Sequence, residues 1–171
     1  MRDDMTDTAP GEIGQMIVKG PNGCRYLDDI ERQRNYVRDG WNLSGDLCLR
    51  DADGYINFEA RTDDMILTGG YNVSGLEVEA VLMEHAKVRE CAVVGAPDPD
   101  RGEIVKAFVT LCDPGQATEA TKRELQDFVK AQISAFKYPR AVEFVETLPL
   151  TATGKIQRGA LRMLERERAA N

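Results

Sequence analysis

The hydrophobic pattern of the chain changes near residue 64, and this change limits the folds that the sequence can adopt. Within residues 55–60, apolar side chains occupy every second position, which is the period of a half-buried β-strand. Within residues 75–85, apolar side chains recur three or four positions apart, which is the period of one helix face. The pattern therefore predicts a β-rich segment followed by a mixed segment of helices and strands.

The first segment, residues 1–62, is expected to be almost entirely β. The predicted elements are a strand over 12–19, a short helix or helical turn over 29–37, and a hairpin with strands at 47–49 and 55–60. In the second hairpin strand, Ile56, Phe58 and Ala60 are expected on the buried face. Because this segment begins inside a β pattern without a helical partner, we interpret it as the tail of a larger domain that is not in this chain.

The second segment, residues 63–171, is expected to follow the order β-α-β-β-α-β-α and to have a core of its own. Ser74 and Glu77 form a capping-box pattern before the helix 75–85, and Thr121 and Glu124 form another before a helix that Pro139 stops. Further strands are predicted over 88–94, 104–112 and 141–145, and a final helix over 159–169. We expect this last helix to turn Met163 and Leu164 toward the core and the charged run 162–168 toward solvent.

Composition excludes several classes of function. The 22 Lys+Arg and 29 Asp+Glu give a net charge of −7, so no basic excess exists to bind nucleic acid. No apolar run approaches the ~20 residues of a membrane span, and the acidic start is not a secretory signal. Four cysteines with one histidine are poor material for a metal site. Cys48, Cys91 and Cys112 lie in strand-like runs, which suits free buried thiols and a cytoplasmic location.

Two clusters in and after the first segment could bind a ligand. Asp46 follows a Ser-Gly turn and could present its carboxylate oxygens to the vicinal hydroxyls of a sugar, or it could simply bond the turn. Arg61 could hold a phosphate or hydroxyls, and Asp63 lies where a hinge between the segments would lie. The alternative for Arg61 is an ordinary surface pair with an aspartate.

Two clusters in the second segment could also carry chemistry. Gly69 and Gly70 permit a sharp bend and close approach by a ligand, although they could form only a turn. Lys155 lies at the tip of an exposed Pro-Thr-Thr-Gly loop. This loop is no P-loop, because Pro149 replaces its first glycine and Ile156 its Ser/Thr. Lys155 could still act as a point charge on a phosphate, or be a solvated turn lysine.

In this order and at these spacings, the clusters resemble the C-terminal portion of the adenylate-forming superfamily, which includes acyl- and aryl-CoA synthetases. The matching stretches are Gly11 to Gly20, Ser44 to Asp46, Arg61 to Val73 with Glu77 to Glu79, Phe136 to Pro139, and Leu148 to Lys155. Tyr26 to Asp29, Tyr36 to Asn42 and Glu59 to Asp64 most resemble aryl-CoA ligases of the benzoate and 2-aminobenzoate kind. Ala60 and Ser44 depart mildly from the usual Gly and Thr.

The resemblance implies an α+β fold in which the β-rich tail of a large N-terminal domain, 1–62, precedes a small α/β C-terminal lid domain, 63–171. It implies that Asp46 and Arg61 bind the ATP ribose and that the lid turns at Asp63. Lys155 would then stabilise the α-phosphate and the substrate carboxylate during adenylation. The remaining implied site is the tunnel for the pantetheine arm of coenzyme A, lined by Gly69, Gly70 and Tyr71.

The implied reaction converts a small, aromatic carboxylic acid with ATP to an acyl-adenylate, and then with coenzyme A to a thioester. The superfamily's phosphate loop and acyl pocket are missing from this sequence, so we expect the chain to be inactive alone. The missing N-terminal domain, with the Mg²⁺ that accompanies ATP, is expected in cis or in trans. The alternatives are an adenylation domain that serves a carrier protein, and a non-catalytic α/β interaction module.

Overall fold

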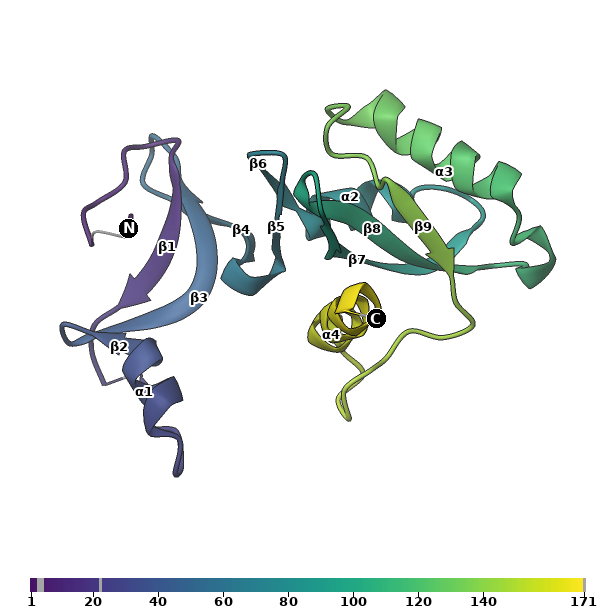
Figure 1. Cartoon of the computed structure of the whole chain (residues 1–171). Helices are drawn as coiled ribbons and strands as arrows, with labels where there is room; N and C mark the ends of the chain where they lie inside the picture. Colours follow the sequence, from purple (N-terminus) through teal and green to yellow (C-terminus); the bar gives the residue numbers. More distant parts are fainter. Residues whose placement is uncertain (3–4, 22, 171) are drawn as a thin grey trace. The chain divides into compact units, whose positions relative to one another are not determined.

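The computed structural model describes residues 1–2, 5–21 and 23–170. The chain divides into two compact units, Met1–Asp63 and Asp64–Asn171, which are treated separately below (Figure 1). No helix among the described residues is long and apolar enough to cross a membrane.

The N-terminal unit is built on a four-stranded antiparallel sheet. Strand β3 is its centre and pairs with β1, β2 and β4. The elements are β1 (Ile13–Val18), α1 (Ile30–Tyr36), β2 (Val37–Arg38), β3 (Trp41–Arg50), β4 (Ile56–Arg61) and the 3-10 helix η1 (Thr62–Asp64), which runs into the second unit. The predicted strands, short helix and hairpin are all present.

The prediction that Ile56, Phe58 and Ala60 of β4 are buried is only partly correct. Ala60 is fully buried, but Ile56 is 61% and Phe58 54% exposed. The helix α1 packs beside β2 and β3, so within this unit it leaves the start of β4 uncovered. A two-residue period therefore identified the strand correctly but assigned burial to two side chains that lack it.

The C-terminal unit contains a five-stranded sheet of order β6-β5-β8-β7, with β9 parallel to β8 and the other pairs antiparallel. Its elements are β5 (Met65–Thr68), β6 (Tyr71–Ser74), α2 (Gly75–Met83), β7 (Val88–Asp98), β8 (Gly102–Leu111), η2 (Pro114–Gln116), α3 (Glu119–Gln132), β9 (Ala141–Phe144) and α4 (Arg158–Ala170). Helices and strands are mixed as the sequence predicts, and the α+β fold class is confirmed.

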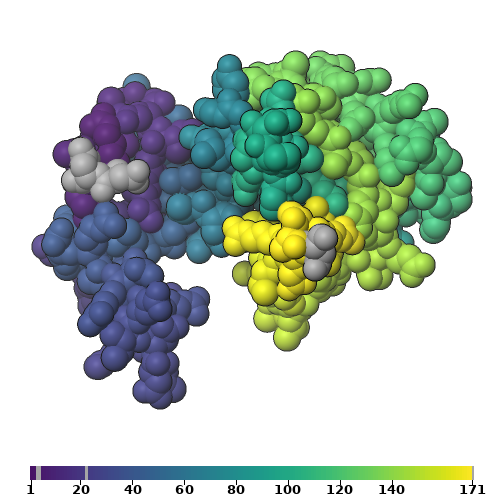
Figure 2. All heavy atoms as spheres, in the orientation of Figure 1, coloured from purple at the N-terminus to yellow at the C-terminus, as the bar shows by residue number. Residues whose placement is uncertain are grey.

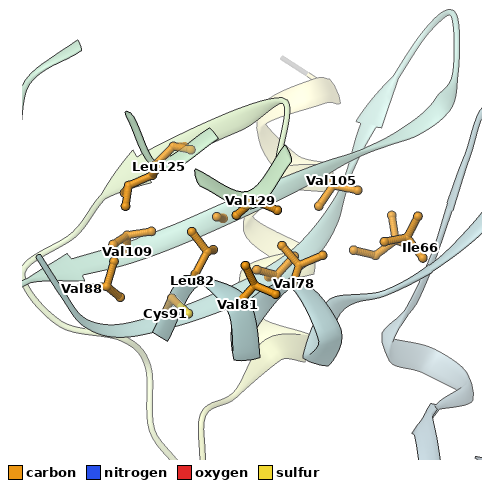
Figure 3. Packing of buried hydrophobic residues seen from close by; sticks show 14 of the residues in the cluster. Ile66, Val78, Val81, Leu82, Val88, Cys91, Val105, Val109, Leu125 and Val129 are labelled. Carbon is orange, nitrogen blue, oxygen red and sulfur yellow. The ribbon is translucent and has the colours of Figure 1, made fainter. Parts of the chain in front are cut away.

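Both faces of this sheet are buried. Side chains of β7 alternate, so that Cys91 and Val93 join the cluster under α2 and α3, whereas Ala92 and Val94 join the cluster under α4. Figure 3 shows the first cluster, in which Leu82 of α2 and Leu125 of α3 meet the strands. The sheet is therefore the middle layer of three, and α4 forms the third layer alone (Figure 1).

Two helix boundaries near α3 differ from those predicted. The helix begins at Glu119, because Thr118 rather than Thr121 is the N-cap and accepts a hydrogen bond from the Thr121 amide. It ends at Gln132, well before Pro139, since Ile133 is already extended. At α2 the predicted cap is confirmed: Ser74 Oγ accepts from the Glu77 amide at 3.4 Å.

The predicted orientation of α4 is wrong. Leu161 and Glu165 are buried, whereas Met163 is 61% and Leu164 37% exposed. The charged run is not simply solvated, since Glu165 accepts a hydrogen bond from Lys106 Nζ at 2.8 Å. The helix places polar side chains against the sheet because partners of opposite charge meet them there.

The cysteines are all free, but only Cys91 is buried. Cys48 is partly buried, and Cys112 is exposed because it follows the last residue of β8. The expectation of buried thiols is thus wrong for Cys112. The described residues contain no group of His, Cys, Asp or Glu that could hold a metal ion.

Candidate functional site

Asp46 and Arg61 face each other across the β3–β4 ladder. Arg61 donates to Asp46 Oδ1 at 2.9 Å and to the Ser44 carbonyl at 3.2 Å. The Asp46 side chain is 23% and that of Arg61 48% exposed, so both can still reach a ligand. The structure therefore brings the two proposed ribose ligands together as a hydrogen-bonded pair on one sheet.

The turn before Asp46 is held by other groups. Ser44 Oγ donates to the Met16 carbonyl and accepts from the Asp46 amide, and Thr62 Oγ donates to the Gly45 carbonyl at 3.1 Å. Gly45 has φ +76°, and a Cβ there would lie 3.0 Å from the Arg61 guanidinium. The Asp46 carboxylate is thus not the group that bonds the turn.

Asp63 is the last residue of the N-terminal unit and lies in the 3-10 helix Thr62–Asp64. Its side chain is 66% exposed, and its carboxylate lies 3.7 Å from Arg61 Nε. Asp64, which begins the next unit, is instead mostly buried with Arg162. Two adjacent aspartates therefore have opposite environments at the boundary.

Gly69 and Gly70 form the two-residue turn of the β5–β6 hairpin, in which Thr68 pairs with Tyr71. Their φ values of +56° and +84° are those of a tight hairpin turn, which glycine adopts without strain. A Cβ on Gly70 would meet nothing within 4 Å. Tyr71 stacks on Phe136 with ring centroids 4.6 Å apart.

Lys155 lies on a tight loop that precedes α4. The Thr151 amide donates to the Lys155 carbonyl at 2.7 Å, and the Lys155 amide donates to Thr151 Oγ at 3.0 Å. Leu150 and Ile156 form a bridge at the base of the loop. The backbone is thus fixed while the lysine side chain is exposed, and no described residue forms an ion pair with it.

The structure keeps Lys155 apart from the diglycine turn. Figure 1 shows the loop before α4 at the opposite end of the C-terminal unit from the β5–β6 hairpin, and Figure 2 shows both at its surface. One unit therefore presents two distinct candidate surfaces.

A set of buried ion pairs beneath α4 was not predicted from the sequence. Arg158 donates to both oxygens of Glu79, at 2.8 and 2.5 Å, and Arg162 donates to Asp64 at 2.5 Å. The hydrogen bonds that Arg158 donates to Glu79 raise the pKa of Arg158. The spacing of the two arginines by four residues was a signal that could have placed them on one helix face.

A second missed pair joins α2 to the segment after α3. Lys137 Nζ donates to both carboxylate oxygens of Glu77 at 2.7 Å. The Glu77 carboxylate therefore binds this lysine, a partner that the capping pattern in the sequence did not indicate.

Comparison with known proteins shows that the chain is similar to AMP-binding enzymes. Residues 77–155 match the family described as AMP-binding enzyme C-terminal domain. The chain is 42% identical over 165 residues to the uncharacterized acyl-CoA ligase YtcI of Bacillus subtilis, covering 95% of this chain and 31% of the relative. It is 47% identical over 164 residues to the mitochondrial acyl-coenzyme A synthetase ACSM4 of Rattus norvegicus, covering 93% of this chain and 28% of the relative.

Solved structures agree with this likeness. The anthranilate CoA ligase AuaEII in complex with anthranoyl-AMP is 39% identical, with a TM-score of 0.86 over 99% of this chain and 33% of that one. The o-succinylbenzoate CoA synthetase MenE of Bacillus subtilis is 32% identical, with a TM-score of 0.81 over 95% of this chain and 32% of that one. The chain therefore spans about a third of the length of the proteins it matches.

Proposed function

From the homology of residues 77–155 to the AMP-binding enzyme C-terminal domain, and of the chain as a whole to adenylate-forming acyl-CoA ligases, we propose that this chain supplies the C-terminal part of an AMP-forming acid–CoA ligase. In the first half-reaction a carboxylate attacks the α-phosphate of ATP and releases pyrophosphate. In the second, the thiol of coenzyme A attacks the acyl carbon and releases AMP.

The observation that carries this proposal is the exposed Lys155 on a loop with a fixed backbone. An ammonium group ~4 Å from a phosphate is worth about 4 kcal/mol at an effective dielectric constant of ~20. If that interaction strengthens only in the transition state, the gain is roughly a thousandfold in rate. Lys155 is thus assigned to adenylation.

The other candidate residues receive roles consistent with their geometry. Asp46 and Arg61, already paired at 2.9 Å, would accept from and donate to the ribose hydroxyls. Asp63 would be the pivot at which the C-terminal unit turns between half-reactions. Gly69, Gly70 and Tyr71 would border the path of the pantetheine arm. The Mg²⁺ that accompanies ATP would be held by the large AMP-binding domain, since the described residues contain no group of His, Cys, Asp or Glu that could hold a metal ion.

We further propose that this chain acts together with a large AMP-binding domain, attached or separate, and that the acid is aromatic. Support for the acid comes from the similarity to the anthranilate and o-succinylbenzoate CoA ligases. The enzyme that contains this chain, assayed with benzoate, 2-aminobenzoate and straight-chain fatty acids, should prefer the aromatic acids. A preference for the fatty acids would contradict this part of the proposal.

The role of the chain is tested by joining it to the N-terminal region of the anthranilate CoA ligase in place of that enzyme's own C-terminal region. We expect ATP–pyrophosphate exchange and CoA thioester formation to be restored relative to the truncated ligase alone. A folded chimera that performs neither half-reaction would overturn the proposal. A chimera that transfers the acyl group only to a carrier protein would favour the adenylation-domain alternative.

A further inference from the structure

Two arginines of α4 share one face and are both largely buried. The side chains of Arg158 and Arg162 are 21% and 17% exposed, and their carboxylate partners Glu79 and Asp64 are 11% and 12% exposed. Arg158 and Glu79 form a bidentate ion pair, the geometry that fixes the orientation of a guanidinium most strictly. Neither pair is an ordinary solvated contact.

Such pairs are not needed for stability alone. Desolvating two charges offsets most of their attraction, and apolar residues of similar volume are often equally or more stabilising. A buried pair can supply a unique register instead, when only one arrangement satisfies both charges.

The two ion pairs connect the beginning of the C-terminal unit and the helix α2 to the last helix, α4. Asp64 begins the unit and leads through the β5–β6 hairpin into α2, which carries Glu79. Arg158 is the first residue of α4, follows the Lys155 loop and binds Glu79. One helical turn later, Arg162 binds Asp64. The Lys155 loop is thus tied through α4 to the residue that follows Asp63.

We infer that Arg158 and Arg162, with Glu79 and Asp64, are positioning residues that couple the Lys155 loop to the pivot. This inference rests on the proposed function. When the unit turns at Asp63, the Lys155 loop moves with Asp64 as one rigid body because α4 is fixed to both. The diglycine turn does not depend on α4 in this way, since the strand β5 joins it directly to Asp64.

The inference predicts a selective defect. Neutral pair variants, Glu79→Gln with Arg158→Met and Asp64→Asn with Arg162→Met, remove both charges of each pair together. In the first, the amide oxygen of the introduced glutamine can still accept from the Val93 amide, which Glu79 binds at 2.8 Å. In the chimera, we expect pyrophosphate exchange to fall about tenfold or more, because small misplacements of a reacting group are costly. Thioester formation from supplied acyl-adenylate should change less than about twofold.

Three controls keep the outcomes distinct. Arg166→Met alters an exposed arginine of the same helix and should leave both half-reactions unchanged. Amide hydrogen exchange on the chain itself should show faster exchange in residues 150–157 of the pair variants, with the core strands still protected. Equal loss of both half-reactions, or full retention of both, would overturn the inference. Failure of the unmodified chimera to catalyse either half-reaction would instead count against the proposed function.

Discussion

Glu79 is the residue on which several polar contacts of the C-terminal unit converge. Its carboxylate accepts hydrogen bonds from the Val93 amide and from Arg158, and its carbonyl faces the Cys91 thiol at 3.6 Å. A carboxylate on a side chain that is only 11% exposed is tolerated because these donors replace the water it has lost. The same buried surroundings also change the pKa of the neighbouring Cys91 thiol.

Cys91 is expected to be chemically inert in the folded chain. Burial, with a smaller contribution from the Glu79 charge, raises the pKa of its thiol to about 12, so the reactive thiolate is scarce near neutral pH. At pH ~8, iodoacetamide followed by mass spectrometry should label the exposed Cys24 and Cys112 but label Cys91 only after unfolding in denaturant. Labelling of native Cys91 at the rate of Cys112 would contradict this assignment.

Gly70 offers a test of the proposed pantetheine path with a closely matched control. Gly70 and Gly54 both occupy hairpin turns with similar φ, +84° and +89°, and open space beyond. Leucine at either position should cost about 1–2 kcal/mol of stability through the strained backbone. In the chimera, Gly70→Leu should block thioester formation from acyl-adenylate while sparing pyrophosphate exchange, and Gly54→Leu should spare both. Equal thioester rates in the two variants would exclude Gly70 from the path.

Among the secondary-structure elements, α4 is the helix that covers the second face of the sheet in the C-terminal unit. Leu161 is buried with Phe108 and Leu148, whereas Met163 is exposed. Leu161→Ala should lower the free energy of unfolding by about 2–4 kcal/mol, and Met163→Ala by less than about 0.5 kcal/mol. Urea denaturation followed by circular dichroism measures both. A larger loss of unfolding free energy in Met163→Ala would instead support the buried helix face predicted from the sequence.

Most of the order of elements could be predicted because these elements bear strong local signals, but the strand β6 (Tyr71–Ser74) was not predicted. β7 and β8 are long apolar runs, and Ser74 is a cap directly before a helical repeat. The boundary of α3 was missed because Thr118 and Thr121 are both acceptable caps, and the two lie within one helical turn of each other. Local patterns cannot choose between them, whereas in the structure the Thr121 amide donates to the Thr118 hydroxyl and so identifies Thr118 as the cap.

The orientation of α4 could not be predicted from hydrophobicity. Its core-facing positions include Arg158, Arg162 and Glu165, which belong on a solvated face by any apolar count. Their partners lie far away in the sequence, so only the folded chain reveals why burial is tolerated. The exposed start of β4 is a similar case, because what covers a strand face is decided by other elements.

The candidate site was predictable to the extent that single residues bear recognisable chemistry. Asp46, Arg61 and Lys155 could be selected from local motifs, and the structure pairs the first two across one ladder. The supporting ion pairs could not, since each joins α4 to a residue earlier in the unit. Positioning residues are generally harder to find from sequence than the groups they position.

For the whole molecule, the proposed function requires two surfaces of the C-terminal unit to act one after the other. The Lys155 loop and the diglycine turn lie at different ends of the C-terminal unit (Figure 1), so a single fixed pose could not present both to one reacting centre. A turn at Asp63 resolves this, because each half-reaction then uses one surface. Separation of the two half-reactions by mutation is the direct consequence.

The most direct test compares Lys155→Ala with Lys130→Ala in the chimera. Lys130 lies on α3 and pairs with Asp127 at the surface, so its removal controls for loss of a positive charge. We predict that Lys155→Ala lowers the rate of acyl-adenylate formation roughly a thousandfold, leaves conversion of supplied acyl-adenylate to thioester intact, and that Lys130→Ala changes neither rate. Equal loss of both half-reactions in Lys155→Ala, or no loss of adenylation, would contradict the account.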